Sequence, residues 1–166
     1  MEKKGKITYQ SIGKIITNFN VGKGTPIQPT ANGAGDGKIE LFSEYLEGLK
    51  DLEGFSHIIL LYHCHKAGKP SLLVKPFLDN KKHGIFSIRA PSRPNCIGLS
   101  IVHLIKIEKN ILYIKDVDIL NGTPLLDIKP YVPGFDQREN VKIGWLEMNL
   151  KNISSVEDDG RFSGHN

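Results

Sequence analysis

The most constraining feature of this sequence is a long alternating segment, IGLSIVHLIKIEKNILYIKDVDIL, which spans residues 97–120. Apolar and polar side chains alternate along both of its halves, and the tripeptide EKN separates the two halves. Successive side chains of a β-strand point to opposite faces, so this alternation indicates strands with one buried face. The segment therefore predicts a β-hairpin that turns at residues 108–110.

Shorter segments extend the β pattern, whereas one segment has helical spacing. Strands are predicted at residues 6–17, with Gly13 as a bend or bulge, and at 38–42, 55–65, 71–77 and 84–90. Residues 43–54 predict a helix with Ser43 as its N-cap. Strands do not alternate regularly with long helices, which argues against a Rossmann sheet. We expect a mainly β protein, a compact single-domain β-barrel with one or two short helices.

The length, charge and cysteine content fit one intracellular domain. Residues 1–150 are assigned to the barrel, and residues 151–166 are predicted to form a polar, frayed tail. The net charge of +4 permits a polyanionic partner without requiring one. The chain shows no secretory signal and no apolar stretch long enough to span a membrane. Together with only two cysteines, Cys64 and Cys96, this predicts a reducing, cytoplasmic location.

Two weaker patterns suggest other chemistry. His57, His63 and His65 fall on one face of the predicted strand at 55–65, where they resemble part of a metal site, although histidines on a half-buried strand are more often structural. Cys96 beside Asn95 suggests a thiol nucleophile, but nothing in the sequence places a histidine near it. We therefore expect no metal, and we expect both cysteines to be buried free thiols.

The loop RAPSRPNCIGLS, residues 89–100, gives a sharper signal because it places Arg89 and Arg93 on a backbone stiffened by two prolines. Guanidinium groups suit carboxylates and phosphates, which accept two parallel hydrogen bonds. A second stiff polar stretch, DILNGTPLLDIKPYVP at 118–133, follows the hairpin. The two stretches form either a shared pocket rim, or a plain turn followed by a proline-capped edge. The pattern alone leaves both interpretations open.

These two stretches also carry a family resemblance. HGIFSIRAPSRPNCIGLSIVHL and DILNGTPLLDIKPYVPGFD, preceded by TPIQ, GLKDLEGFSHIILLYHCH and VKPF in that order, resemble the TsaA-like, or TrmO-type, tRNA methyltransferases over residues 7–146. The resemblance implies a β-barrel homodimer that binds S-adenosylmethionine without a Rossmann sheet. It also implies methyl transfer to N6 of threonylcarbamoyladenosine at position 37, in the anticodon loop of a tRNA.

The resemblance also assigns site residues. Implied S-adenosylmethionine contacts are Pro26, Ile27, Gln28, Cys64, His65, Arg89, Leu99, Asp118, Ile119 and Leu120. Implied catalytic and tRNA-facing groups are Arg93, Asn95, Asp127, Lys129 and Tyr131. The chain departs from the family pattern at three positions, where Ile27 replaces arginine, Cys96 replaces proline and Asn121 replaces aspartate.

The reaction needs alignment and a proton acceptor more than a strong base. Asp127, held by Lys129 and Tyr131, is the candidate acceptor, and its alternative is a structural ion pair. Arg93 is expected to clamp a phosphate or the threonyl carboxylate of the modified base. The departures keep a second hypothesis open, a module that binds S-adenosylmethionine or RNA without methyl transfer. A metal-assisted hydrolase built on the three histidines is the third.

Overall fold

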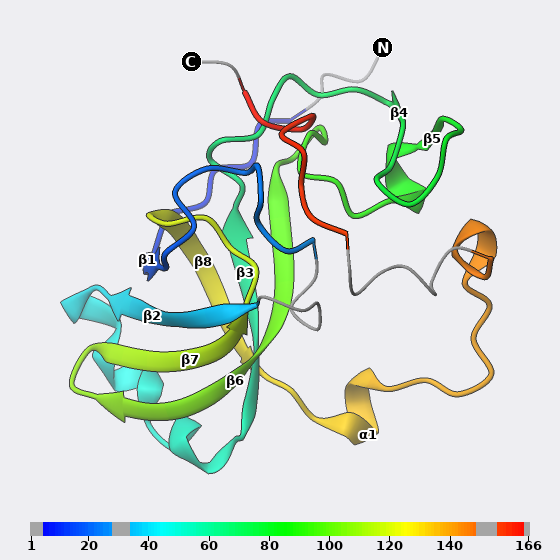
Figure 1. The fold of residues 1–166 in the computed structure, drawn as a ribbon. Helices are drawn as coiled ribbons and strands as arrows, with labels where there is room; N and C mark the ends of the chain where they lie inside the picture. Colours follow the sequence, from blue (N-terminus) through cyan, green and yellow to red (C-terminus); the bar gives the residue numbers. More distant parts are fainter. Residues whose placement is uncertain (1–4, 28–33, 149–155, 165–166) are drawn as a thin grey trace.

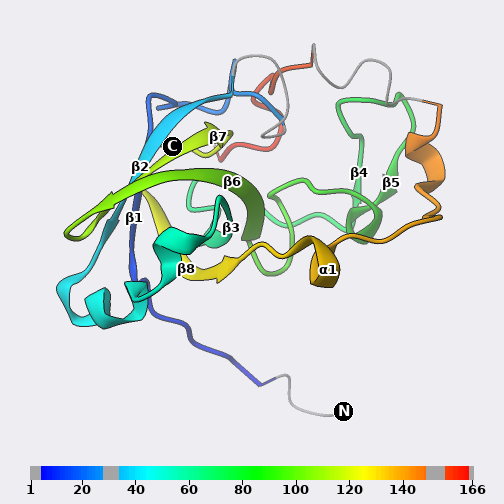
Figure 2. The same cartoon turned by 90° about the horizontal axis from the view of Figure 1, so that it is seen from below.

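Six antiparallel strands close into a barrel, as the alternating pattern predicts. The structure, a computed structural model, describes residues 5–27, 34–148 and 156–164. Around the barrel the strands follow the order β1-β2-β7-β6-β3-β8, and Figures 1 and 2 show them wrapping around one interior. Their bounds are Gly13–Ile16 (β1), Gly35–Leu41 (β2), His57–His63 (β3), Ile97–Glu108 (β6), Ile111–Val117 (β7) and Thr123–Pro130 (β8). The expected mainly β, non-Rossmann architecture is confirmed.

The predicted hairpin is β6 and β7, and its inward side chains fill the barrel. The two strands pair from His103↔Lys115 to Glu108↔Ile111, and Lys109 lies in the turn with φ of 56°. On β3 the predicted alternation also holds, because Ile58 and Leu60 are fully buried whereas Ile59 and Leu61 face outward. The buried core of the barrel consists of Ile15, Ile39, Leu41, Ile58, Leu60, Val102, Leu104, Leu112, Ile114, Val117, Ile119 and Leu125.

At Gly13 the expected bend or bulge is wrong. β1 pairs with β2 in unbroken register, with Gly13 opposite Leu41. A Cβ on Gly13 would come within 3.0 Å of backbone atoms of Glu40 and Leu41. Glycine is therefore needed here because two backbones approach closely, and that approach helps to close the barrel.

The predicted helix at 43–54 is wrong in type. It forms two 3-10 segments, η1 (Ser43–Leu49) and η2 (Leu52–Gly54), separated by Asp51 with φ of 67°. The residue before η1 is Phe42, and no side chain caps the segment, so Ser43 is not its N-cap. A left-handed residue between two short turns prevents continuous i→i+4 bonding, which explains why helical spacing overstated the element.

The strands predicted at 71–77 and 84–90 are mostly irregular. They contribute a two-stranded ribbon, β4 (Leu73–Val74) and β5 (His83–Gly84), followed by the 3-10 turn η3 (Ile85–Ser87). Figure 1 shows this ribbon standing apart from the barrel. The chain after the barrel forms the single-turn helix α1 (Pro133–Asp136) and the 3-10 turn η4 (Gly144–Leu146).

The stiff polar stretch at 118–133 is largely a strand. β8 pairs with β1 on one side and with β3 on the other, although it contains Pro124 and Pro130. The two prolines lie next to the ends of the strand, where fewer ladder hydrogen bonds are lost. The turn expected at residues 121–122 is present, but the proline-capped edge is wrong, because β8 is paired on both sides.

Residues 156–164 do not fray. Phe162 is buried against Val74, Ile85 and Ala90 in a second apolar cluster. Ser92 Oγ and Gly68 N both donate to Phe162 O, at 3.0 and 2.9 Å.

In the described part of the chain, no helix has the length and apolar character needed to cross a membrane.

Candidate functional site

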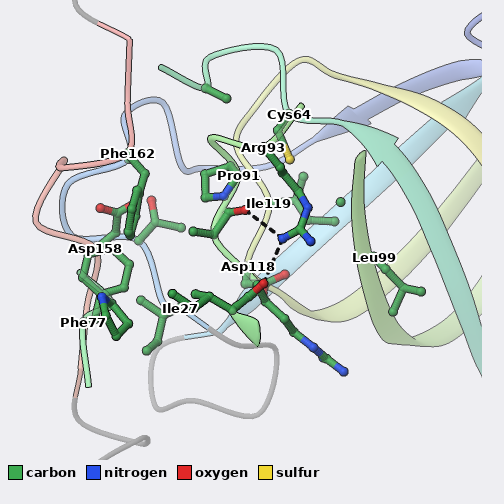
Figure 3. Close-up of a pocket in the computed structure, with 18 of the residues that line it drawn as sticks. Ile27, Cys64, Phe77, Pro91, Arg93, Leu99, Asp118, Ile119, Asp158 and Phe162 are labelled. Atoms are coloured by element: carbon green, nitrogen blue, oxygen red, sulfur yellow. Dashed lines mark hydrogen bonds between the residues drawn. The ribbon is translucent and has the colours of Figure 1, made fainter. Parts of the chain in front are cut away.

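One cavity of about 760 Å³ lies between the barrel and the outlying ribbon. Its walls come from six separate parts of the chain: the segment around 22–27, the end of β3 with the residues that follow it, the 76–99 region, residues 118–123, η4 and residues 156–164. Figure 3 shows Phe77, Asp158 and Phe162 along one side of this pocket and Leu99 on the opposite side. Its volume is that of a small-molecule site.

The pocket gathers most of the predicted cofactor contacts. The predicted residues that line it are Pro26, Ile27, Cys64, His65, Arg89, Arg93, Leu99, Asp118, Ile119 and Leu120. Gln28 lies outside the described residues. The predicted groups that do not line it are Asn95, Asp127, Lys129 and Tyr131. The shared pocket rim is therefore formed, with its second half supplied by residues 118–123 and not by the rest of the 118–133 stretch.

Asp118 ends a hydrogen-bonded chain that begins at Tyr62. Ser100 Oγ donates to Asp118 Oδ1 at 2.8 Å, and Tyr62 Oη lies 3.0 Å from Ser100 Oγ. A serine hydroxyl has one hydrogen, so Tyr62 is the donor in the second bond. Burial raises the pKa of Asp118 to about 6, against the lowering effects of the bond from Ser100 and of nearby Arg89. Burial also raises the pKa of Tyr62, which keeps this hydroxyl a donor.

Gly98 makes room for the ring of Tyr62. The two residues face each other across β3 and β6, and a Cβ on Gly98 would come within 3.0 Å of three atoms of the ring. The tyrosine can therefore lie flat over the β6 backbone and reach Ser100, two residues further along. This packing fixes the chain of hydroxyls that orients Asp118.

His65 is held by a second short relay. Thr123 Oγ1 donates to Leu120 O at 2.7 Å and lies 3.2 Å from His65 Nδ1. Because the hydrogen of the threonine is already used, His65 donates from Nδ1 and keeps Nε2 as an acceptor. Desolvation and nearby Lys66 lower the pKa of His65, which favours this neutral form.

The thiol of Cys64 is not a nucleophile in this setting. Burial, followed by the neighbouring Cys96, raises its pKa to about 12, so the reactive thiolate is scarce at neutral pH. Cys96 Sγ donates to Arg93 O at 3.4 Å. Both cysteines are free, as expected, but they are half-buried and not buried as predicted.

Arg93 braces its own loop. Its Nη1 donates to Ile88 O at 2.9 Å and to Ala90 O at 3.2 Å, the two bonds drawn as dashed lines in Figure 3. The side chain also lines the pocket. Arg93 therefore has a structural role in its loop, and its role as an anion clamp stays a prediction.

Replacing Arg93 by alanine should lower the free energy of unfolding by about 1.5–3 kcal/mol, because two charge-assisted bonds to half-buried carbonyls are lost. Arg138→Ala is the matched control. Arg138 also donates to two carbonyls, those of Phe135 and Gln137, but it is exposed, and we expect a change below about 0.5 kcal/mol. Urea unfolding of both variants measures this difference. Equal stabilities would show that Arg93 does not brace the loop.

Asp127 and Lys129 form an ion pair on the outer face of β8. Lys129 Nζ lies 2.8 Å from Asp127 Oδ2, and both side chains are substantially exposed. The pairing raises the pKa of Lys129. Tyr131 contacts His57 edge-on, with 6.4 Å between ring centroids. The structure thus forms the predicted pair, but outside the pocket.

Asn121 has a structural role at the position where the family pattern has aspartate. Its Oδ1 accepts from Thr17 N at 3.2 Å, and its Nδ2 donates to Asn20 Oδ1 at 3.0 Å. A carboxylate could make the first bond but not donate the second. Asparagine at position 121 therefore bridges two loops. This role is structural and does not involve proton transfer.

The three histidines of the metal hypothesis have unrelated surroundings. His57 stacks on His103 with 4.9 Å between centroids, His65 bonds to Thr123, and His63 is exposed. Among the described residues, no three histidine, cysteine, aspartate or glutamate side chains lie close enough to hold a metal ion. The geometry gives the hydrolase hypothesis no site.

Comparison with known proteins identifies the family of this chain. The model of the tRNA-methyltransferase O N-terminal domain matches residues 14–137, most of the chain and all of the barrel strands from the second residue of β1 onward. The chain belongs to the TrmO family.

Relatives of this TrmO-family chain include proteins named for cofactor binding and for methyl transfer. A probable S-adenosyl-L-methionine-binding protein of Pyrococcus abyssi is 56% identical over 94% of this chain and 85% of its own. The human tRNA (adenine(37)-N6)-methyltransferase is 36% identical over 89% of this chain, which spans 35% of the human protein. The crystal structure of TrmO from Pseudomonas aeruginosa superposes with a TM-score of 0.71 at 35% identity, covering 85% of this chain and 63% of that one.

Several pocket residues of this TrmO-family chain escaped the sequence reasoning. Tyr62 and Gly98 were not recognised, and neither was Phe86, Asp158 or Phe162. A glycine inside the alternating β6 pattern was the available signal, since an interior strand glycine indicates close approach by another group. For Asp158 and Phe162 the polar tail offered no periodic signal.

Proposed function

We propose that this chain uses S-adenosylmethionine to methylate N6 of adenosine 37 in a tRNA, and that its preferred acceptor is threonylcarbamoyladenosine. The observation that carries the proposal is the pocket, which gathers ten predicted site residues in a chain 36% identical to the human tRNA (adenine(37)-N6)-methyltransferase. We place the reaction in the cytoplasm, where the two free cysteines stay reduced.

The pocket suits the proposed cofactor in size and charge. When bound, S-adenosylmethionine supplies a methyl group activated by a positively charged sulfur. Asp118 offers a half-buried carboxylate to a cation, and apolar walls such as Ile119 and Ile27 exclude water. His65 Nε2 and Asp118 Oδ2 are the acceptors left open by the two relays. These groups hold and orient the donor, which is most of what an in-line transfer requires.

The candidate proton acceptor lies beyond the pocket edge. Asp127 pairs with Leu61, and Leu61 pairs with Leu99, so the three residues lie side by side across three strands. With strands about 4.8 Å apart, Asp127 is roughly 10 Å from pocket-lining Leu99. A substrate nucleotide that extends over Leu99 would bring its N6 proton toward this carboxylate. The proposal keeps Asp127 as acceptor, with Lys129 paired to it at 2.8 Å.

The proposal is tested by incubating the protein with methyl-labelled S-adenosylmethionine and tRNA that carries or lacks the threonylcarbamoyl group. We expect label at N6 of adenosine 37, with faster transfer to the modified tRNA. Equal rates on both tRNAs would remove the preference for threonylcarbamoyladenosine and leave the methyltransferase. Label at another position would overturn the proposal.

The name of the Pyrococcus abyssi relative and the three departures from the family pattern favour one alternative. The Pyrococcus protein is named for binding alone, and Ile27 and Cys96 are pocket-region residues where the family pattern has arginine and proline. A binding module would show cofactor affinity in isothermal titration without label transfer in the same preparation. That result would replace the proposed function with this alternative.

We also propose that the chain forms a homodimer through the outer face of β3 and β6. This apolar face consists of Ile59, Leu61, Ile97, Leu99 and Ile101. It continues into the pocket at Leu99, and the charged pair of β8 lies along its side. A second copy of the same face would cover the exposed aliphatic groups and bring the pair of one copy near the pocket edge of the other.

Replacing Ile101 by aspartate should convert the dimer to a monomer, because a charge would be buried within this apolar interface. Ile16→Asp is the matched control. The two isoleucines are 38% and 39% exposed, but Ile16 lies on β1. Sedimentation equilibrium should give twice the 18.5 kDa chain mass for the wild type and the control. A wild type at 18.5 kDa, or an unchanged Ile101→Asp dimer, contradicts this interface.

A further inference from the structure

Phe86 is a solvent-exposed aromatic residue that lines the pocket. It exposes 79% of its surface and yet lines the cavity, whereas Ile119, which lines the same cavity, is only 2% exposed. A single exposed phenylalanine is ordinary on a protein surface. One that lines the open side of a ligand pocket offers a flat face to whatever enters.

The backbone around Phe86 is fixed on both sides. The preceding residue, Ile85, is buried in the second apolar cluster. The following residue, Ser87, donates from Oγ to Gly84 O at 2.8 Å, and its carbonyl accepts from Trp145 Nε1 at 2.9 Å. The ring is therefore presented by an anchored turn. A pre-ordered aromatic loses little entropy when a ligand covers it.

The chain segment that carries Phe86 is rich in positive charge. Residues 66–93 contain seven lysines and arginines and one aspartate, a net charge of +6, whereas the whole chain carries +4. Lys66, Arg89 and Arg93 of this segment line the same pocket as Phe86. A phosphate backbone is drawn to such a segment, and unpaired bases stack on aromatic rings.

We propose that Phe86 is a stacking platform for an unpaired nucleobase of the RNA substrate, an inference that rests on the proposed function. The adenine of the cofactor has the same ring chemistry, but the proposed cofactor contacts Asp118 and Ile119 are both more buried than Phe86. The exposed ring is on the side that a macromolecule reaches first. Stacking there holds the splayed nucleotide while the pocket receives its neighbour or the target base itself.

The test compares RNA and cofactor binding in matched variants. A fluorescent RNA with the sequence of an anticodon stem–loop is titrated by anisotropy, and S-adenosylmethionine by calorimetry. Phe86→Ala should weaken RNA binding roughly 5- to 150-fold and leave cofactor affinity unchanged. Phe86→Tyr keeps a stacking ring and should stay within about twofold of the wild type. Phe135→Ala, which removes a ring that is 72% exposed on α1 away from the pocket, should have no effect.

The outcomes separate this inference from the proposed function. Unchanged RNA affinity in Phe86→Ala overturns the platform even if the wild type methylates tRNA. A parallel loss of cofactor affinity assigns the ring to the adenine of the cofactor and also overturns it. Methyl transfer by the wild type is assayed in the same preparations, and its absence, with the RNA-affinity pattern intact, would overturn the proposed reaction while supporting the platform.

Discussion

Asp118→Asn is expected to make the protein more stable at neutral pH while weakening its binding of S-adenosylmethionine. The pKa of Asp118 is raised from 3.8 to about 6 by burial, so folding opposes ionisation of this carboxyl. Below about pH 3.8 both the folded and unfolded states hold the proton and the residue contributes nothing. Between pH 4 and 6 the folded state loses stability as pH rises. Above pH 6 the destabilisation caused by ionising this buried carboxyl is complete.

At pH 7.5, Asp118→Asn should raise the free energy of unfolding by about 1–3 kcal/mol. Two pKa units correspond to roughly 2.7 kcal/mol, and the side chain is half-buried. Ser100 can still donate to the amide oxygen of the variant. Thermal unfolding should show a raised Tm at pH 7.5 and no change at pH 4. Asp36→Asn, at an exposed position on β2, is the control that should change neither.

Cofactor affinity should fall at least about tenfold in Asp118→Asn, because a neutral amide replaces the carboxylate that faces a cationic ligand. Calorimetric titration at pH 7.5 measures it. A variant that binds as tightly as the wild type would show that Asp118 does not pair with the cofactor. A variant that melts earlier would show that the carboxylate stabilises the fold, contrary to the effect of its burial.

Gly98→Ala should damage both the fold and the pocket. A methyl group at this position would overlap the ring of Tyr62, and overpacking of this kind costs about 1–3 kcal/mol. The displaced ring would release Ser100, and Asp118 would lose its fixed orientation. We therefore expect a lower Tm together with a cofactor affinity reduced by about tenfold or more.

A double-mutant cycle identifies the cause. In a Tyr62→Leu background the ring is absent, so adding Gly98→Ala should cost less than about 0.5 kcal/mol. Gly48→Ala is the control for the substitution itself, because a Cβ there meets nothing within 4 Å. If Gly98→Ala costs the same with and without the ring, the overlap with Tyr62 is not the reason for glycine at this position.

The barrel was predictable because its strands carry strict alternation with one buried face. The β6–β7 hairpin and the inward residues of β3 follow directly from that period. β8 was missed because Pro124 and Pro130 read as breakers, and only the register shows that they lie beside the strand ends. The 3-10 character of residues 43–54 depends on the left-handed backbone at Asp51, which helical spacing does not reveal.

The site residues that belong to short sequence motifs could be predicted. Those brought together only by the pairing of distant strands could not. The arginine loop and residues 118–120 were named from sequence and do line one cavity. Tyr62, Ser100 and Asp118 lie 38 and 18 residues apart along the chain, so their contact requires the β3–β6 register and the path of β7. Phe162 was missed because its partners Val74 and Ile85 are more than 70 positions away and a lone phenylalanine has no period.

The wall supplied by residues 156–164 sets an order of events during synthesis. All barrel strands precede Pro130, so the barrel can close while this segment is still being made. Domains fold from the N-terminal side as the chain emerges at about 5–20 residues per second. The pocket gains Asp158, Phe162 and Ser163 only afterwards. A nascent chain can therefore close its barrel before the pocket wall that carries Asp158, Phe162 and Ser163 is in place.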